Sequence, residues 1–195
     1  PSGVPGADPG RLTAACAALC ERFAEAGAAA IHLETAYDPQ ELLSALRGAR
    51  QGAPSLPLLC SLTLSLGNSG LETPLGTPLA HMLRTMDREP PDATGLNCSQ
   101  SARRMGPSVE ALRRWTQGHM AILVQPQVDQ TAPDCKRRTP PETDEQFVHG
   151  VLQLMALGAD AVGGCCGCRG SHLAALRRAL AEAPATAPGP TRVTL

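Results

Sequence analysis

The stretch Gly163-Gly164-Cys165-Cys166-Gly167 follows a short apolar segment, residues 159–162, that has the composition of a buried strand. Successive side chains of a regular strand point to opposite faces, so two adjacent cysteines within it could not bind one ion. The flanking glycines relax this rule, because glycine adopts backbone angles that break the pleat. We therefore expect the chain to kink as the strand ends and to turn both sulfurs toward one point.

A third cysteine, Cys98, ends another candidate strand in Thr94-Gly95-Leu96-Asn97-Cys98. Three thiolates from two strand ends, with one position left free, are typical of a catalytic zinc site rather than a closed structural one. The alternatives are core packing, which is common for cysteine, and a strained vicinal disulfide. Spacing alone leaves metal binding and core packing equally open, since a Cys-Cys pair far from its third partner is not a zinc-finger spacing.

Composition narrows the class of protein. The chain has 195 residues, enough for one sizeable core, and a net charge of −1 with scattered arginines, which does not favour a nucleic-acid or membrane surface. No apolar run approaches the roughly 18 residues of a membrane span, and no signal-peptide pattern opens the chain. The chain has eight cysteines, but its length and its helical patterning argue against a small disulfide-bonded domain. We expect a reducing, cytoplasmic setting, which suits thiolate ligands.

Apolar periodicity and capping residues predict alternating strands and helices. Helices are expected at 12–27, 38–52, 77–86, 107–115, 143–158 and 171–181, and strands at 28–33, 58–64, 120–124, 159–162 and before residue 98. Units of about 30 residues are typical of βαβ connections, which leaves an open doubly wound sheet or a barrel. Polar residues follow several strands, as in barrel enzymes: Glu34, Asn97, Cys98, Gln127 and Cys165. Five βα units cannot close an eight-stranded barrel, which typically needs about 250 residues.

Three motifs also carry a resemblance. Leu33-Glu34-Thr35, Gly95-Leu96-Asn97-Cys98 and Gly163-Gly164-Cys165-Cys166-Gly167, in that order, resemble motifs of the homocysteine S-methyltransferase family over about residues 11–180. The resemblance implies an α/β fold, a TIM (β/α)8 barrel, here truncated to about the last five βα units. It implies Zn²⁺ held by Cys98, Cys165 and Cys166, and transfer of a methyl group to the thiol of homocysteine to give methionine.

The resemblance extends to other residues and to partners. It implies that Glu34 binds the amino group of homocysteine, and Asn97 and Gln127 are further candidates for substrate binding. The implied methyl donor is a corrinoid (methylcobalamin) supplied by another domain or protein, S-methylmethionine, or betaine. The sequence does not decide between these donors.

The chain departs from the family at three places. It lacks an Asp-Gly-x-x-Gly-Thr loop, it reads Gln127 where the family usually has asparagine, and Cys168-Arg169-Gly170 replaces a Thr-Thr-Pro run. Because the chain starts at Pro1, we expect a missing part upstream. We expect a linker-like segment at 1–10, the homocysteine-binding partial-barrel domain at 11–182 and a disordered tail at 183–195.

Two other functions stay open, and several residues have plain interpretations. The chain could be a non-catalytic zinc-binding fragment, or, as the weakest alternative, a thiol redox protein that uses Cys165 and Cys166. Cys135 and Cys168 could be additional ligands, although exposed free thiols are the preferred interpretation. For the five histidines, surface or packing roles are favoured over ligation, because they share no spacing.

Overall fold

The computed structural model describes residues 8–67, 70–128 and 141–182. Its helices are α1 (Pro9–Glu25), α2 (Pro39–Gly52), α3 (Leu79–Met86), α4 (Ala102–Thr116), α5 (Asp144–Ala156) and α6 (Gly170–Glu182). Its strands are β1 (Ile31–Ala36), β2 (Leu58–Leu62), β3 (Ser65–Gly67), β4 (Gly70–Glu72), β5 (Ala93–Asn97), β6 (Ala121–Gln125) and β7 (Ala161–Val162).

The fold is α/β, with five strands in one sheet in the order β1-β2-β5-β6-β7. A helix lies between each consecutive pair of these strands in the sequence, as in parallel βαβ units. The pairs β1/β2 and β6/β7 run parallel. The predicted alternation of five strands with helices is therefore confirmed.

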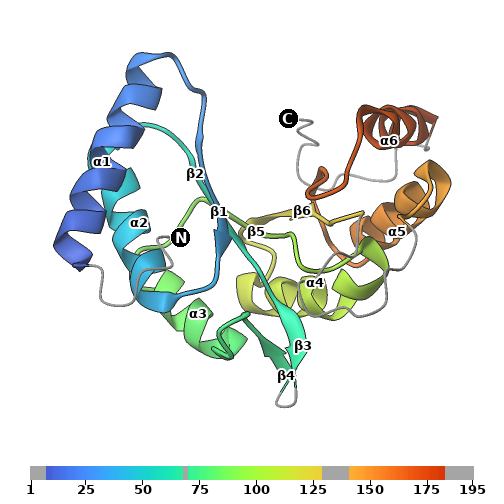
Figure 1. Ribbon diagram of the computed structural model, residues 1–195, viewed down its shortest axis with the longest axis horizontal. Helices are drawn as coiled ribbons and strands as arrows, with labels where there is room; N and C mark the ends of the chain where they lie inside the picture. Colours follow the sequence, from blue (N-terminus) through green and yellow to red (C-terminus); the bar gives the residue numbers. More distant parts are fainter. Residues whose placement is uncertain (1–7, 68–69, 129–140, 183–195) are drawn as a thin grey trace. The chain divides into compact units, whose positions relative to one another are not determined.

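The chain divides into two compact units, Pro1–Thr94 and Gly95–Leu195, and each is described by itself. In the first unit α1 packs along α2 (Figure 1). The backbones approach so closely that a Cβ on Gly52 would lie 2.0 Å from the Ala17 carbonyl oxygen, and one on Gly48 would lie 2.5 Å from that of Thr13. Glycine is required at both positions, because any side chain there would separate the helices.

In the second unit α5 packs against α4 on one side and α6 on the other. Phe147 and Val151 of α5 and Val109 and Leu112 of α4 are fully buried, and Leu154 is 1% exposed. Apart from Phe147, the core residues named here are aliphatic, in keeping with the low aromatic content of the chain, and they pack closely.

Helix starts follow their capping chemistry. The Asp38 carboxylate accepts from the backbone N–H groups of Gln40 and Glu41, both at 2.9 Å. Thr143 and Gln146 form a complete capping box, each side chain accepting from the other's backbone N–H. The predicted starts of α2 and α5 are confirmed.

Several predicted elements were wrong in extent. The stretch between the strand expected at 58–64 and the helix expected at 77–86 contains an antiparallel hairpin, β3/β4. Helix α4 begins at Ala102, five residues before the expected start, and Pro107 lies inside it. Proline there removes one backbone hydrogen bond, a cost offset by the burial of Met105 on the added turn.

Of the strand expected at 159–162, only Ala161–Val162 has strand conformation. Strand β1 starts three residues later than expected, because Gly27, at φ +85°, ends α1 in a turn. Among the helices of the described ranges, none combines the length and apolarity that a membrane crossing needs. The expected linker at 1–10 was wrong at its end, because Pro9 and Gly10 belong to α1. Its residues 1–7, residues 129–140 and the whole expected tail at 183–195 lie outside the described residues.

Candidate metal centre and acidic cavity

Three sulfurs from two strand ends come together in the second unit. The Sγ atoms of Cys98, Cys165 and Cys166 all lie within 4.8 Å of one another. The Cys98 and Cys166 sulfurs are 3.4 Å apart, and those of Cys165 and Cys166 are 3.9 Å apart. Sulfurs bound at about 2.3 Å to one tetrahedral zinc ion stand about 3.8 Å from each other. The three cysteines therefore have the spacing of ligands to a single metal ion.

The end of β6 and the segment after it hold all three cysteines through backbone hydrogen bonds. The Cys98 N–H donates to the Gln125 carbonyl at 3.1 Å, and the Cys165 N–H donates to the Pro126 carbonyl at 3.0 Å. The Val128 N–H donates to the Cys166 carbonyl at 2.9 Å. Because β5 and β7 both neighbour β6 in the sheet, one central strand fixes both cysteine-bearing segments.

The kink predicted after the last strand is present. Strand β7 ends at Val162, and Cys165 and Cys166 lie in a turn beyond it. The Cys168 N–H donates to the Cys165 carbonyl at 2.9 Å, and Gly167 has φ +78°, the conformation that a type II turn requires of its third residue. Because Cys165 and Cys166 lie outside the strand, their side chains need not point to opposite faces, and both sulfurs can approach one ion.

Cys98 itself lies in a strained conformation. Its φ is +60° and that of Ser99 is +47°, in the left-handed region that residues with a Cβ rarely adopt. Strain of this kind is retained where the surrounding structure imposes it, and it concentrates at functional sites. The turn directs the Cys98 sulfur toward the other two.

The cysteines of this cluster can ionise together only if a cation lies among them. Burial raises the pKa of Cys98 to about 12, an effect opposed by the Ser99 N–H and reinforced by the sulfurs of Cys166 and Cys165. Burial also raises the pKa of Cys165. Thiols this close cannot all ionise together unless a positive charge lies between them. Soft thiolate donors select zinc over magnesium or calcium, so this donor set fits Zn²⁺.

The two predicted amide residues lie beside the cluster. Gln127 is 8% exposed, and its Oε1 is 3.9 Å from the Cys98 sulfur, which donates to it. Asn97 precedes Cys98 and is 1% exposed. The structure thus brings Gln127 into contact with a predicted ligand and buries Asn97 next to it.

Glu34 lies in the first unit, at the carboxyl end of β1. It lines a cavity of about 250 Å³ together with His32, Thr35 and residues at the start of α2. Three acidic residues line this cavity, Glu34, Asp38 and Glu41, and none of the described residues that line it is a lysine or an arginine. An acidic cavity of this kind attracts a cationic group such as an ammonium ion.

Two neighbours shape the surroundings of Glu34. His32 Nδ1 is 3.3 Å from the Glu34 carboxylate, and His32 Nε2 is 2.8 Å from the Ser61 hydroxyl. Burial lowers the pKa of His32, and the Glu34 charge opposes that shift. Thr35 has φ +61°, a marked outlier for a β-branched residue. A strained residue thus follows Glu34 just as a strained cysteine follows Asn97.

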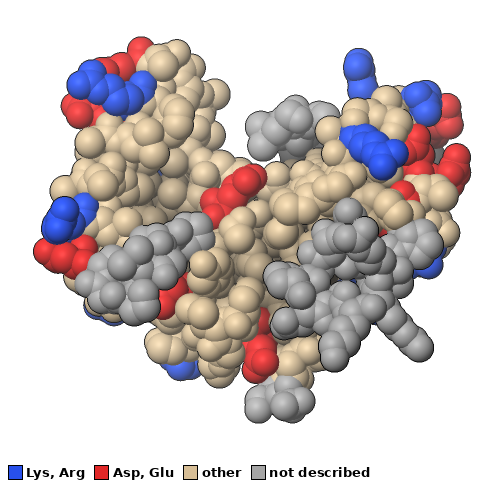
Figure 2. Space-filling model, viewed as in Figure 1, with Lys and Arg blue, Asp and Glu red and all other residues tan. Residues whose placement is uncertain are grey.

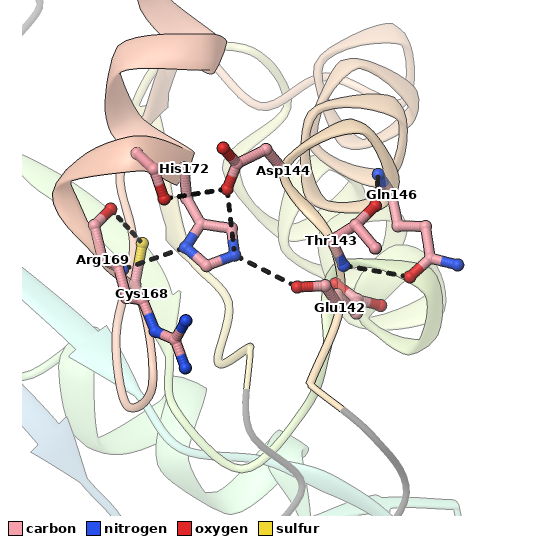
Figure 3. A network of polar contacts seen from close by, with 8 residues as sticks. Glu142, Thr143, Asp144, Gln146, Cys168, Arg169 and His172 are labelled. Atoms are coloured by element: carbon pink, nitrogen blue, oxygen red, sulfur yellow. Dashed lines mark hydrogen bonds and ion pairs between the residues drawn. The ribbon is translucent and has the colours of Figure 1, made fainter.

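A polar network supports the segment that follows the cysteines (Figure 3). His172, on α6, is 3% exposed; its Nδ1 accepts from the Arg169 N–H at 3.0 Å, and its Nε2 donates to the Glu142 carbonyl at 3.1 Å. Nε2 is also 3.5 Å from the Asp144 carboxylate, and the ring packs edge-on against Phe147. His172 therefore ties the cysteine segment to the start of α5, a packing role like the one expected for the histidines.

Cys168 differs from the exposed free thiol that the sequence favours. It is partly buried rather than exposed, and its sulfur lies next to the backbone at Gly164, where an added Cβ would be 2.2 Å away. The spacing Cys165-x-x-Cys168 is common in metal and redox sites, and it is the sequence signal that marks Cys168 as a functional candidate.

Charged residues are dispersed over the face shown in Figure 2, where acidic and basic side chains lie interspersed. Attraction of a charged ligand on that face therefore depends on local groups rather than on a broad field of one sign.

An α/β fold that brings three cysteine sulfurs together beyond its strand ends has the donor set of a thiolate–metal centre. The chain belongs to the homocysteine S-methyltransferase family, whose sequence model matches residues 10–180. A comparison with curated proteins found no significant match.

A solved methyltransferase structure shows a similar fold. The apo homocysteine methyltransferase MmuM from Escherichia coli aligns with a TM-score of 0.68 and 20% identity, covering 89% of this chain and 58% of that one. An enolase from Streptomyces coelicolor aligns with a TM-score of 0.49 and 14% identity, over 88% of this chain and 45% of that one. The chain thus spans little more than half the length of the methyltransferase structure.

Proposed function

We propose that the chain takes part in methyl transfer to the thiol of homocysteine, with Zn²⁺ held by Cys98, Cys165 and Cys166. The observation that carries this proposal is the convergence of three sulfurs within 4.8 Å of one another. Membership of the homocysteine S-methyltransferase family supports the identity of the substrate.

The chemistry explains why such a cluster is useful. A free alkyl thiol titrates near pH 8.5, so little thiolate, the nucleophilic form, exists at neutral pH. Zinc, when bound, would keep a fourth sulfur deprotonated and electron-rich. The chain's own contribution is to hold three sulfurs in place and to position the acceptor, which alone can accelerate a displacement greatly. The reaction needs no general base from a histidine.

The substrate contacts are part of the same proposal. Glu34 would bind the ammonium group of homocysteine, which the acidic lining of its cavity supports. Gln127 and Asn97 would contact the substrate near the cysteines. Methyl transfer itself would take place at the sulfur, where the strained turn at Cys98 fixes one side of the centre.

The wider setting follows from the same reasoning. The five-stranded sheet is proposed to be part of a (β/α)8 barrel, truncated here to about five βα units, in a cytoplasmic enzyme of methionine biosynthesis. The methyl donor is a small molecule, S-methylmethionine or betaine, or a corrinoid carried by another domain or protein. The sequence match and the coverage of the methyltransferase structure support this placement.

The test is a methyl-transfer assay on the zinc-loaded chain with homocysteine and each donor in turn. We expect methionine to form with one donor class and not after the metal has been removed. No methionine with any donor, despite full zinc, would favour the non-catalytic zinc-binding alternative.

Glu34→Gln gives a second, independent test. Loss of a charged hydrogen bond costs roughly 1.5–3 kcal/mol, so homocysteine should bind about 10- to 150-fold more weakly, with zinc content unchanged. Glu41→Gln probes the neighbouring carboxylate of the cavity, and Glu89→Gln, which removes a partner of Arg47 elsewhere in the unit, is the control. Equal homocysteine affinity in wild type and Glu34→Gln would remove Glu34 from the site.

A further inference from the structure

Cys168 is the fourth cysteine of the second unit within the described residues, and it closes a turn on a proposed ligand. Its backbone N–H donates to the Cys165 carbonyl at 2.9 Å, so the two residues end one β-turn. A β-turn holds its first and last Cα atoms less than about 7 Å apart. Two cysteines separated by two residues are also the commonest spacing for a pair that binds one zinc ion.

The Cys168 side chain packs against Gly164, but its polar contact is weak. Its sulfur lies outside the group formed by the other three sulfurs. Its polar contact is with the Arg169 carbonyl at 3.9 Å, long even for sulfur (Figure 3). Rotation about one Cα–Cβ bond would give up little, because this contact is at the limit of a hydrogen bond.

The turn itself is firmly anchored. The Arg169 N–H donates to the buried His172 ring, and the Cys165 N–H donates to the Pro126 carbonyl. Both ends of the turn are thus fixed. The backbone of Cys168 is therefore held within one β-turn of Cys165, a proposed ligand, and only its side chain would have to rotate.

We propose that Cys168 provides the fourth sulfur ligand of the metal centre when no substrate thiol is bound. The inference rests on the proposed function and goes beyond it, because it makes the resting centre a closed four-sulfur site. Homocysteine would then bind by displacing Cys168, so Cys168 would set the apparent affinity for the substrate.

The exchange is balanced in atoms and charge. The incoming thiol loses its proton as its sulfur becomes a ligand, and the Cys168 sulfur takes up one proton as it leaves. No electron is transferred, so no oxidant is required. If Cys168 occupies the position in about nine molecules of ten, homocysteine binds about tenfold more weakly than to an open site.

The experiment counts thiolates with Cd²⁺ as the probe. The purified protein is loaded with one equivalent of Cd²⁺, and its sulfur-to-metal charge-transfer absorbance is compared with that of Cys168→Ser and Cys168→Ala. We expect both variants to retain Cd²⁺ and to lose about one quarter of the absorbance, because one of four sulfurs is gone. Homocysteine should bind the variants about tenfold more tightly. Cys16→Ser, which changes a thiol of α1 in the first unit, is the control and should behave as wild type.

The contrary outcomes are distinct. Equal absorbance in wild type and both variants would mean a three-sulfur centre; it would overturn the role of Cys168 and leave the proposed function standing. Loss of one sulfur on Cys135→Ser instead would overturn it as well. A Cys165–Cys168 disulfide in the Cd²⁺-loaded protein, found by mass mapping, would also be incompatible with it. Failure of the wild type to bind Cd²⁺ at all would overturn both proposals.

Discussion

The two units contain the same arginine–aspartate arrangement, yet they bury it to different degrees. In the first unit Asp92, just before β5, accepts from the Leu58 N–H at 2.7 Å and from Arg50 at 3.0 Å. In the second unit Asp160, just before β7, accepts from the Ile122 N–H at 2.9 Å and pairs with Arg113. In each case the aspartate N–H also returns a bond of 2.8 Å to the same neighbouring strand residue.

The correspondence extends to the arginine. Arg50 also donates to the carbonyl two residues before its aspartate, Pro90, and Arg113 does the same to Gly158. The exposures differ, with 31% and 53% for the Arg50 and Asp92 side chains against 26% and 14% for Arg113 and Asp160. The same connection is therefore close to solvent in one unit and largely buried in the other.

The opposite ends of the strands show no such repetition. At the carboxyl ends the first unit has Glu34 and its acidic cavity, whereas the second unit has the three-sulfur cluster. In α/β barrels, residues at the amino ends of the strands serve stability and those at the carboxyl ends carry chemistry. The two units share an arginine–aspartate arrangement at the amino ends of their strands and differ at the carboxyl ends, which fits that division.

The largest effect should come from the carboxyl end of β5. Cys98→Ser should abolish stoichiometric zinc retention, because a hydroxyl is a far poorer zinc ligand than a thiolate. Metal analysis of the purified variant measures this, with Cys16→Ser as the thiol control. Full zinc in Cys98→Ser would remove Cys98 from the centre.

Much of this site could be predicted from local sequence. The glycines around Cys165 and Cys166 indicated a kink, and the capping residues Asp38 and Thr143 marked helix starts. These signals are local, because they depend on the backbone freedom of glycine and on side chains that bond within the same turn.

The remaining features depend on contacts between distant residues. Nothing local marks Asp92 or Asp160, whose partners lie 34 and 38 residues away in the sequence. The positive φ values of Thr35 and Cys98 could not be predicted either, since their residue types disfavour that conformation. Such strain is stabilised by the tertiary structure, so propensity gives no warning of it.

The buried arrangement should contribute more stability than the exposed one. Asp160→Asn removes the charge that pairs with Arg113 while keeping an acceptor for Ile122, and we expect a loss of about 1.5–3 kcal/mol in the free energy of unfolding. Asp92→Asn should cost less than about 1 kcal/mol, as is usual for exposed ion pairs. Urea denaturation measures the free energy of unfolding of both variants. Equal losses would show that burial does not make the Asp160 arrangement more stabilising.

A smaller effect is expected at the turn that holds the cysteines. A methyl group on Gly164 would lie 2.2 Å from the Cys168 sulfur and 2.8 Å from its Cβ, and rotation of the side chain cannot move the Cβ away; Gly164→Ala should therefore shift the turn and weaken zinc binding about tenfold, as for residues that orient ligands. Competition with a chelator gives the affinity. Gly170→Ala is the matched control, because nothing lies within 4 Å of an added Cβ there. Equal affinities for the two variants would mean that the turn does not position Cys165.

The smallest effect concerns pH in the first unit. The hydrogen bond from Arg50, helped by the Leu58 N–H, lowers the pKa of Asp92, so its unfolded-state pKa of about 3.9 lies above the folded-state pKa. The native state then binds fewer protons than the unfolded state between these two values, and stability rises with pH there. The stabilising contribution is complete above the unfolded pKa and is lost as the pH falls through the folded pKa. Wild type should therefore exceed Asp92→Asn in urea midpoint at pH 7, and the difference should shrink steadily below about pH 4. A difference that persists unchanged down to the acid limit of folding would show that the carboxylate charge does not stabilise this end of the sheet.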